Sequence, residues 1–444
     1  MGKPIRNVIM IATDQQKVDA MSCVDSSYHT PNLDKLVERG VRFTGVISTS
    51  AQCSPSRATW MTGKYPHQVG VYNIGHVLDP EEWGIAKEFN KAGYETVYFG
   101  KWHLGLSAAA HEFQITDYRT DGMELGGANP DPRFHSNKDA VTTSKALNYL
   151  EACEGNKPFF MKLCWYMPHP NTPVDSPFEL VEHFARQFPL EDMPIPNSYL
   201  HDDLSSKPSF QRQRALDSES ELTEELVRRD AQRYRAMLTL MDWNLGRLME
   251  KLEAKGLIEN TTILFTSDHG DMQGAHRLRL KGVLPYKELY NVPVILYVPG
   301  ITPSRKVIPD LVSSAAVTGT LLAAAGIEVP AECEGGSLFP SLEQPEPPVD
   351  ELVFFEHYKA YWGYHPLRGV QSPEWKYVYY FEDDVEEMYN LRLDPDELVN
   401  VAGQPEAESA RSRLRQAVDE WWTATGGLTR PFVMDPNSKW GREG

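Results

Sequence analysis

Short apolar runs that end in a carboxylate alternate with helix-like stretches along much of the chain, and this alternation limits the possible folds most strongly. Residues 7–14, NVIMIATD, are typical of a buried parallel strand, and residues 260–268, NTTILFTSD, repeat the pattern. Apolar side chains spaced three and four apart from Tyr234 to Leu252 predict a long helix that Gly256 ends. The alternation predicts an α/β fold in which helices flank a large, mostly parallel sheet.

The pattern changes at residues 343–351, EQPEPPVDE, which form a Pro- and acid-rich break. Beyond it, the strand-like runs ELVFFEHY and WKYVYYFE precede a predicted helix around residues 406–423, which indicates a smaller α+β unit built on a short antiparallel sheet. Because 444 residues are many for one compact unit, we expect a large α/β domain over residues 1–345 and a C-terminal subdomain over residues 346–444. The polar, Pro- and Ser-rich segment 170–222 is predicted to be a long loop region.

Charge and hydropathy narrow the range of partners. The net charge of −18 argues against nucleic acid as a partner, because a polyanion would be repelled by the chain as a whole. No apolar run approaches the length that spans a membrane, and the first apolar run is too short for the core of a signal peptide. We therefore expect no nucleic-acid or membrane partner. The expected location is cytoplasmic, or periplasmic or secreted if a leader was removed.

Polar side chains follow two predicted strands, at the position where ligands collect in α/β proteins. Asp14 and Gln15 come at the end of the first run, and Asp268 and His269 at the end of the later one. Because the carboxyl ends of parallel strands meet at one edge of a sheet, these four side chains could converge. Two carboxylates, an amide oxygen and an imidazole suit a divalent metal such as Ca²⁺ or Mg²⁺. The alternative is that each aspartate is a turn residue or a helix cap.

Cys53 stands directly before the run SPSRATWMTG. Ser54 is a candidate N-cap and Pro55 fits the first helical position, so Cys53 is expected at a helix N-terminus. Arg57 adds a cation one turn on, and a thiol in such a place has a lowered pKa. The five cysteines are scattered, odd in number and without a Cys-x-x-Cys pair, which disfavours a disulfide framework. Cys53 remains open to three interpretations: a buried small side chain, a thiolate nucleophile or the precursor of another group.

Further candidate cations and proton donors also follow predicted strands. The run GKWHLG places Lys101 and His103 two residues apart, and in an extended segment both would point to the same face. His169 lies between prolines in YMPHPNTP, and Lys281 follows Asp268 after a short loop. Each alone could be a surface charge or a structural residue. Their recurrence at the same topological place favours one common site.

These motifs together resemble a known family. The run CSPSRATWMTG is similar to the sulfatase signature Cys-x-Pro-Ser-Arg, with a Thr-Gly after four more residues. GKWHLG, PHPNTP and SDHGDMQG match other site motifs of that family in order, and WKYVYYFEDDVEEMYNLRLDPDELVNVAG looks like its C-terminal signature. The likeness runs from about residue 7 to residue 425. On these motifs the chain is identified as a member of the formylglycine-dependent sulfatases of the alkaline phosphatase superfamily.

The resemblance implies a specific chemistry for Cys53. In sulfatases the matching cysteine is oxidised by a formylglycine-generating maturation enzyme to an aldehyde, which hydrates to a gem-diol. One hydroxyl attacks the sulfur of a small-molecule or saccharide sulfate ester and displaces the alcohol. The other hydroxyl loses its proton, which expels inorganic sulfate and restores the aldehyde. The resemblance therefore implies a sulfuric ester hydrolase whose catalytic region is the large α/β domain.

The resemblance also implies a role for each site residue. The residues that match metal ligands are Asp14, Gln15, Asp268, His269 and the hydrated form of Cys53. Arg57 matches the residue that steadies the formylglycine, and Lys101 and Lys281 match cations that hold the sulfate oxygens. His169 matches the proton donor to the leaving alcohol, with Lys281 as a possible second donor, and His103 matches the base that deprotonates the second hydroxyl. Asn73 resembles a polar residue near the substrate.

Two departures from the family pattern bear on metal and substrate. Many sulfatases carry adjacent aspartates where this chain has Asp14 and Gln15, and many carry an amide in place of His269. One divalent metal is expected, with Ca²⁺ first and Mg²⁺ or Mn²⁺ as alternatives. The same pairs resemble phosphonate monoester and phosphodiester hydrolases that also use formylglycine, which gives the alternative function. A non-catalytic anion-binding relative predicts a broken site, and a phosphatase-type cysteine needs an arginine six residues beyond it, whereas Arg57 is four beyond Cys53.

Overall fold

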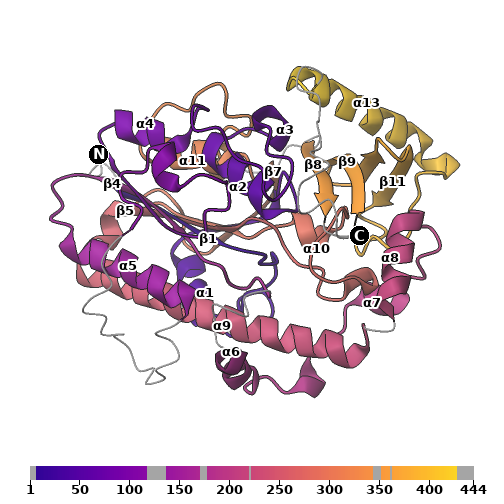
Figure 1. Ribbon diagram of the computed structural model, residues 1–444, viewed down its shortest axis with the longest axis horizontal. Coiled ribbons are helices and arrows are strands. Elements are labelled where there is room, and N and C mark those ends of the chain that lie inside the picture. The colour runs from indigo at the N-terminus through magenta and orange to yellow at the C-terminus, as the bar shows by residue number, and fades with distance from the viewer. Residues whose placement is uncertain are drawn as a thin grey trace.

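The fold contains two separate β-sheets (Figure 1). The computed structural model describes residues 7–117, 137–170, 178–219, 222–343, 352–360 and 363–427. The predicted domain boundary between residues 345 and 346 lies outside the described residues. No helix within the described ranges is long and apolar enough to cross a membrane.

The larger sheet has seven strands in the order β3-β4-β1-β5-β6-β2-β7. The strands are β1 (Asn7–Thr13), β2 (Val41–Ile47), β3 (Glu95–Gly100), β4 (Phe159–Cys164), β5 (Thr261–Ser267), β6 (Val294–Tyr297) and β7 (Lys306–Ser313). All neighbouring pairs are parallel except the two that β6 makes, which are antiparallel. Every residue of β1 and β5 is buried, as continuous apolar runs predict for central strands. The expected mostly parallel sheet is confirmed.

Helices cover both faces of this sheet (Figure 1). One apolar layer joins the sheet to α1 (Pro31–Arg39), α5 (Lys138–Ala152) and α9 (Glu224–Ala254). The other layer joins it to α2 (Cys53–Thr62), α4 (Ile85–Lys91) and α11 (Ala316–Ala324). The predicted stripe on α9 from Tyr234 to Leu252 packs into the first layer, so its apolar spacing serves the core. Shorter helices are α3 (Pro66–Val69), α10 (Lys287–Tyr290) and α12 (Phe339–Glu343).

The prediction of a long loop region over residues 170–222 is wrong for much of that segment. Three helices lie in it: α6 (Phe178–Ala185), α7 (Asn197–His201) and α8 (Ser209–Glu219). The prolines that indicated a loop stand before the helices, since Pro196 is the N-cap of α7 and Pro208 precedes α8. Proline at a helix start costs no backbone hydrogen bond, so a high proline content is compatible with short helices.

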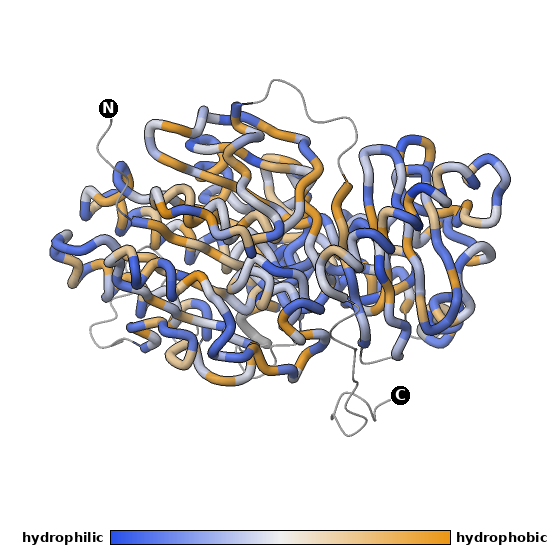
Figure 2. Tube along the Cα trace, turned by 90° about the horizontal axis from the view of Figure 1, so that it is seen from above, coloured by the Kyte–Doolittle hydropathy of each residue, from blue (hydrophilic) through white to orange (hydrophobic). Residues whose placement is uncertain are grey.

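The smaller sheet confirms the antiparallel unit expected near the C-terminus. Its strand order is β11-β10-β9-β8, with β8 (Val353–Ala360), β9 (Gly363–Gln371), β10 (Trp375–Tyr380) and β11 (Val385–Asn390). Helix α13 (Glu408–Ala424) packs on it. Figures 1 and 2 both show this sheet beside the end of the larger one. The backbone N–H of Glu356 on β8 donates to the carbonyl of Thr49 over 2.9 Å, which ties the smaller sheet to the segment before Cys53.

Candidate active site

The two central strands bring Asp14 and Asp268 together. β1 and β5 are parallel neighbours in register from Asn7 to Thr13, so the residues after them leave the sheet at the same edge. The backbone N–H of Gln15 donates to Asp268 Oδ1 over 3.0 Å, and both carboxylates are fully buried. Residues separated by more than two hundred positions thus form one acidic centre, as the strand-end pattern predicts.

Arg57 links these two carboxylates. Its Nε donates to Asp268 Oδ2 over 2.9 Å, and its Nη2 donates to Asp14 Oδ2 over 3.2 Å. Lys101 donates to the same Asp14 oxygen. Burial raises the pKa of the Asp14 carboxyl, but Lys101 and other nearby cations outweigh it and hold that pKa well below its usual value. Two buried carboxylates are therefore balanced by cations from α2 and from the segment after β3.

Cys53 lies at the centre of this cluster. Its Sγ is 2.8 Å from Lys281 Nζ and 3.3 Å from His269 Nε2. Asp14 Oδ1 and Lys101 Nζ are each 3.8 Å from the same sulfur. Burial and the Asp14 carboxylate raise the pKa of the Cys53 thiol. The Lys101 and Lys281 ammonium groups outweigh them, so this pKa lies well below its usual value, as expected for a reactive cysteine.

The start of α2 differs from its prediction by two residues. The helix begins at Cys53 with Gln52 as N-cap, so Ser54 is not the N-cap and Pro55 is not the first helical residue. The reason is that the Ser54 hydroxyl donates to the His103 carbonyl over 2.6 Å instead of capping the helix. Cys53 still lies in the first turn, so its predicted place at a helix N-terminus is correct.

The orientation of His269 is fixed from its far side. His269 Nδ1 is 2.8 Å from the Gly270 carbonyl, so Nδ1 carries the proton and the Nε2 lone pair faces the cluster. Lys281 Nζ lies 3.1 Å from that Nε2 and 3.0 Å from Gln15 Oε1. The Lys281 ammonium thus reaches three side chains of the centre.

Asp271 is a site residue that the sequence did not single out. Its carboxylate accepts a hydrogen bond from Gln15 Nε2, which turns the Gln15 oxygen toward Lys281 and the centre. Gln15 has φ 69°, a left-handed value that is uncommon for a residue other than glycine. Asp271 is 1% exposed. The third residue after a predicted strand-end Asp is too general a signal to have identified it.

His169 lies on the loop after β4 and within electrostatic reach of the cluster. The Asp139 carboxylate accepts from the backbone N–H groups of Tyr166 and Met167, each over 2.8 Å, and so shapes this loop. Burial lowers the pKa of His169 to about 3, and the Lys281 ammonium adds to the shift. Half-buried His169 thus faces the same charges as Cys53.

His103 and Asn73 are placed less directly. Residues 101–103 do not continue β3, and His103 has φ 61°, so the same-face argument for an extended segment does not apply to Lys101 and His103. His103 is joined to α2 by the Ser54 hydrogen bond, and its Nδ1 is buried without a hydrogen-bond partner among the described residues. Asn73 is buried in the segment after α3. None of the contacts described above involves Asn73, so its role stays a prediction.

The donor set fits a divalent cation. Ligand atoms of Asp14, Cys53, Asp268 and His269 all lie within 4.8 Å of one another, and all four residues are buried. The Gln15 oxygen points into the same centre. Carboxylate and amide oxygens with one imidazole match the preferences of Ca²⁺, Mg²⁺ or Mn²⁺. The cluster can therefore hold a metal ion beside a cysteine and several cations.

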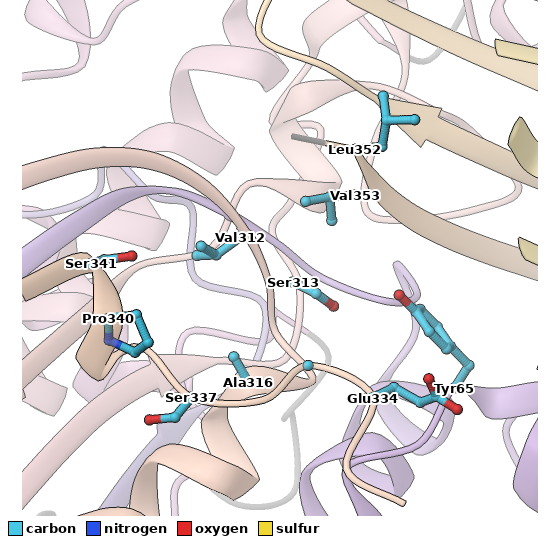
Figure 3. A pocket seen from close by; sticks show the side chains of 11 residues that line it. Tyr65, Val312, Ser313, Ala316, Glu334, Ser337, Pro340, Ser341, Leu352 and Val353 are labelled. Carbon is cyan, nitrogen blue, oxygen red and sulfur yellow. The ribbon is translucent and has the colours of Figure 1, made fainter. Parts of the chain in front are cut away.

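A separate cavity of about 240 Å³ lies between β7, α11 and the start of β8 (Figure 3). Its lining includes Tyr65, Ser313, Glu334 and Ser337. Glu334 also accepts a hydrogen bond from Gln68 Nε2 over 2.6 Å. Within the part of the chain that the structure describes, none of the residues around Cys53 lines this cavity.

Known proteins share the fold and the motif order. A family model described as Sulfatase matches residues 6–327, and a model described as N-sulphoglucosamine sulphohydrolase, C-terminal, matches residues 274–423. The chain is similar to the N-acetylglucosamine-6-O-sulfatase of Bacteroides thetaiotaomicron. The two are 27% identical over 486 residues, which cover 93% of this chain and 86% of that relative.

Solved structures share the fold at lower identity. One, in complex with its substrate D-glucosamine-2-N,6-O-disulfate, has a TM-score of 0.80 and 24% identity and covers 96% of this chain and 99% of that chain. A phosphonate monoester hydrolase from Silicibacter pomeroyi has a TM-score of 0.78 and 22% identity, with 95% and 96% covered. The fold is thus common to proteins named for sulfate esters and for phosphonate esters.

Proposed function

This chain belongs to the sulfatase family, the sulfuric ester hydrolases, and we propose that its catalytic centre is the cluster around Cys53, with Cys53 matured to formylglycine. The observation that carries the proposal is the position of Cys53 Sγ, which is within 3.8 Å of Lys101, Lys281, His269 and Asp14. A buried structural cysteine needs no such set of charges. A nucleophile that receives an anionic sulfate group does.

Asp14, Gln15, Asp268 and His269, together with matured Cys53, would hold one divalent metal, and Ca²⁺ is the expected ion. When bound, the metal lowers the pKa of the attacking hydroxyl and neutralises charge on a sulfate oxygen. Asp271 supports this set by holding the Gln15 amide. The Gly270 carbonyl does the same for the His269 ring, because it fixes the tautomer whose Nε2 can act as a ligand.

Arg57, Lys101 and Lys281 supply fixed positive charge. Arg57 is fully engaged with Asp14, Asp268 and the Lys101 carbonyl, so it steadies the nucleophile and its neighbours. Lys101 and Lys281 approach the sulfur atom of Cys53 directly and are placed to bind oxygens of a sulfate group transferred there. Buried ammonium groups stabilise developing negative charge more than exposed ones do, because little water screens them.

Two histidines are assigned the proton transfers. His169 donates a proton to the leaving alcohol, and its lowered pKa means that an anionic substrate must first raise it, since a nearby anion favours the charged imidazolium. His103 takes the proton of the second hydroxyl, which allows sulfate to leave and the aldehyde to return. Its unpartnered buried Nδ1 supports a role in which the ring acquires a partner during the reaction.

The proposed substrate is a sulfated saccharide or another small sulfate ester. The relative from Bacteroides thetaiotaomicron is named as an N-acetylglucosamine-6-O-sulfatase, and one solved structure with this fold holds a glucosamine disulfate. A formylglycine-generating enzyme is the partner required for maturation. The second candidate function is phosphonate monoester hydrolysis, which the fold of the Silicibacter pomeroyi enzyme and the Asp14-Gln15 pair favour.

Rates on paired substrates test the proposal. Protein produced with a maturation enzyme is assayed on an aryl sulfate, a sulfated monosaccharide and the matching aryl phosphonate ester. We expect kcat/KM to be higher on one of the sulfates than on the phosphonate. A strong preference for the phosphonate would overturn the sulfate assignment while leaving the formylglycine centre in place. The variant Cys53→Ala, purified from the same host, gives the background rate.

A further inference from the structure

Lys281 lies on a loop with an unusual backbone. The loop follows β5 and ends at α10, and Gln273, His276, Arg277 and Leu280 all have φ between 49° and 61°. Residues other than glycine seldom adopt such left-handed values. Two short-range hydrogen bonds shape the loop, from Met272 N to the Leu280 carbonyl and from Gly274 N to the Leu278 carbonyl, each over 2.9 Å. A strained loop of this kind persists only where its surroundings hold it.

Helix α7 and the turn after it hold the loop from outside. His276 Nδ1 is 2.6 Å from Asp202 Oδ2, and the backbone N–H of His276 donates to Ser198 Oγ over 3.1 Å. Arg277 Nε donates to the carbonyl of Tyr199. Both side chains of the His276–Asp202 pair are fully buried. Asp202 Oδ1 also accepts from Leu204 N over 2.8 Å, so the carboxylate is itself fixed.

The other side of His276 rests on the junction with the smaller sheet. The His276 and Tyr286 rings stack with centroids 3.7 Å apart and 13° between their planes. The Tyr286 hydroxyl donates to Gln211 Oε1 over 2.6 Å, and Lys376 Nζ on β10 donates to the Pro285 carbonyl over 2.9 Å. His276 is therefore clamped between α7 on one side and an anchored ring on the other.

We propose that the His276–Asp202 pair is a positioning pair that keeps the Lys281 ammonium at the Cys53 sulfur, where the sulfate group is received. The polar atoms within 3.8 Å of that sulfur belong to Asp14, Lys101, His269 and Lys281 in the described part of the chain. The pair therefore acts through the loop and touches no reacting atom. The inference rests on the proposed function, which assigns sulfate binding to Lys281.

The test is a double-mutant cycle between Asp202→Asn and Lys281→Ala, measured as kcat/KM on the sulfate ester with formylglycine content determined for each sample. If the pair positions Lys281, Asp202→Asn lowers kcat/KM by about 10- to 100-fold in the wild-type background. In the Lys281→Ala background the same change has little effect, because the group it positions is absent. Inhibition by inorganic sulfate weakens in parallel.

Asp242→Asn is the matched control. Asp242 is also a buried aspartate, and it caps α1 through the N–H groups of Asn32 and Leu33 over 3.0 and 2.7 Å, remote in sequence from the loop. Its substitution should change kcat/KM by the same factor in both backgrounds. An equal loss for Asp202→Asn in both backgrounds, or no loss, would overturn the positioning role.

A second pair of variants covers the case in which Asp202→Asn does not fold. His276→Asn keeps an N–H donor near the Nδ1 position and suits a left-handed φ, whereas His276→Ala keeps neither. We expect the asparagine variant to retain most of the activity and the alanine variant to lose it, again only where Lys281 is present. Equal activities of the two would contradict the proposal. If Lys281→Ala alone leaves sulfate hydrolysis unchanged, the role assigned to Lys281 fails instead.

Discussion

Around Cys53, each buried charge is balanced by a side chain from another element. Asp14 after β1 contacts Lys101 after β3, and Asp268 after β5 contacts Arg57 on α2. Arg57 also reaches Asp14, so one guanidinium joins both acids. Removal of one partner from a buried ion pair leaves a charge without compensation, which costs far more than the loss of a surface pair. Single substitutions here should therefore affect both stability and activity.

Arg57→Ala should destabilise the protein by about 3–5 kcal/mol, because it leaves Asp14 and Asp268 facing each other in a buried site. Arg305→Ala is the control, since Arg305 pairs with Glu38 where both side chains are largely exposed, and its loss should cost at most about 1 kcal/mol. Urea denaturation measures both free energies of unfolding. Similar small losses for the two variants would show that the Arg57 pairs contribute no more than a surface pair.

Asp271→Ala should weaken metal binding without removing a ligand. The Gln15 amide loses the acceptor that holds its Nε2, so its oxygen is free to turn away from the centre. Loss of such an outer partner typically lowers metal affinity by about 10- to 100-fold. Calorimetric titration of metal-free protein with Ca²⁺ measures the affinity, and Asp271→Asn should recover part of it through its amide oxygen. Unchanged affinity in the alanine variant would refute this support of Gln15.

Among the secondary-structure elements, the segment after β5 does most to assemble the centre. It carries Asp268 and His269, passes Gly270, and continues to the loop of Lys281. The Gly270 backbone N–H donates to the Leu289 carbonyl on α10 over 2.8 Å, so the chain runs close against that helix. This close approach fixes the start of the loop at a position where a side chain has no room.

Gly270→Ala should therefore separate the segment from α10. A Cβ at residue 270 would stand 1.9 Å from the Glu288 carbonyl oxygen, which is backbone and cannot turn aside. We expect a loss of stability of about 1–3 kcal/mol or more, together with reduced activity. Gly403→Ala is the control, because a Cβ there meets nothing within 4 Å. Thermal unfolding of both variants decides, and an unchanged melting temperature for Gly270→Ala would contradict the close packing.

At the scale of the whole molecule, the proposed metal would join distant parts of the chain. Its ligands come from the ends of β1 and β5 and from the start of α2, so the complete set exists only in the folded state. A ligand that binds only the folded state stabilises it by an amount that grows with its concentration, about 2.7 kcal/mol at one hundred times its Kd. Metal binding should therefore be visible as stability.

Addition of Ca²⁺ to metal-free protein should raise the melting temperature progressively and restore activity. The same addition to Asp14→Asn should have a much smaller effect, because a neutral amide replaces a charged ligand. Differential scanning fluorimetry with Ca²⁺, Mg²⁺ and Mn²⁺ compares the ions directly. A melting temperature that no divalent ion changes would argue against a metal in this centre.

Sequence patterns and motif resemblance predicted the sheet, its covering helices and the meeting of Asp14 with Asp268, because strand periodicity and strand ends are local signals. They missed Asp271 and the His276–Asp202 pair, since a contact between residues 74 apart leaves no periodic trace. The left-handed φ of Gln15 and His276 had no warning from glycine or asparagine. Helix α7 was hidden because the prolines around it resemble those of a loop.

The most direct test of the central claim is the mass of a peptide that covers residues 48–64, taken from active protein of the native source or from protein produced with a maturation enzyme. Conversion of the Cys53 side chain from CH₂SH to CHO lowers the mass by about 18 Da relative to an unmodified cysteine. We predict that hydrolytic activity rises in proportion to the fraction of peptide with the lower mass. Full activity in protein whose Cys53 is an unmodified thiol would contradict the formylglycine mechanism.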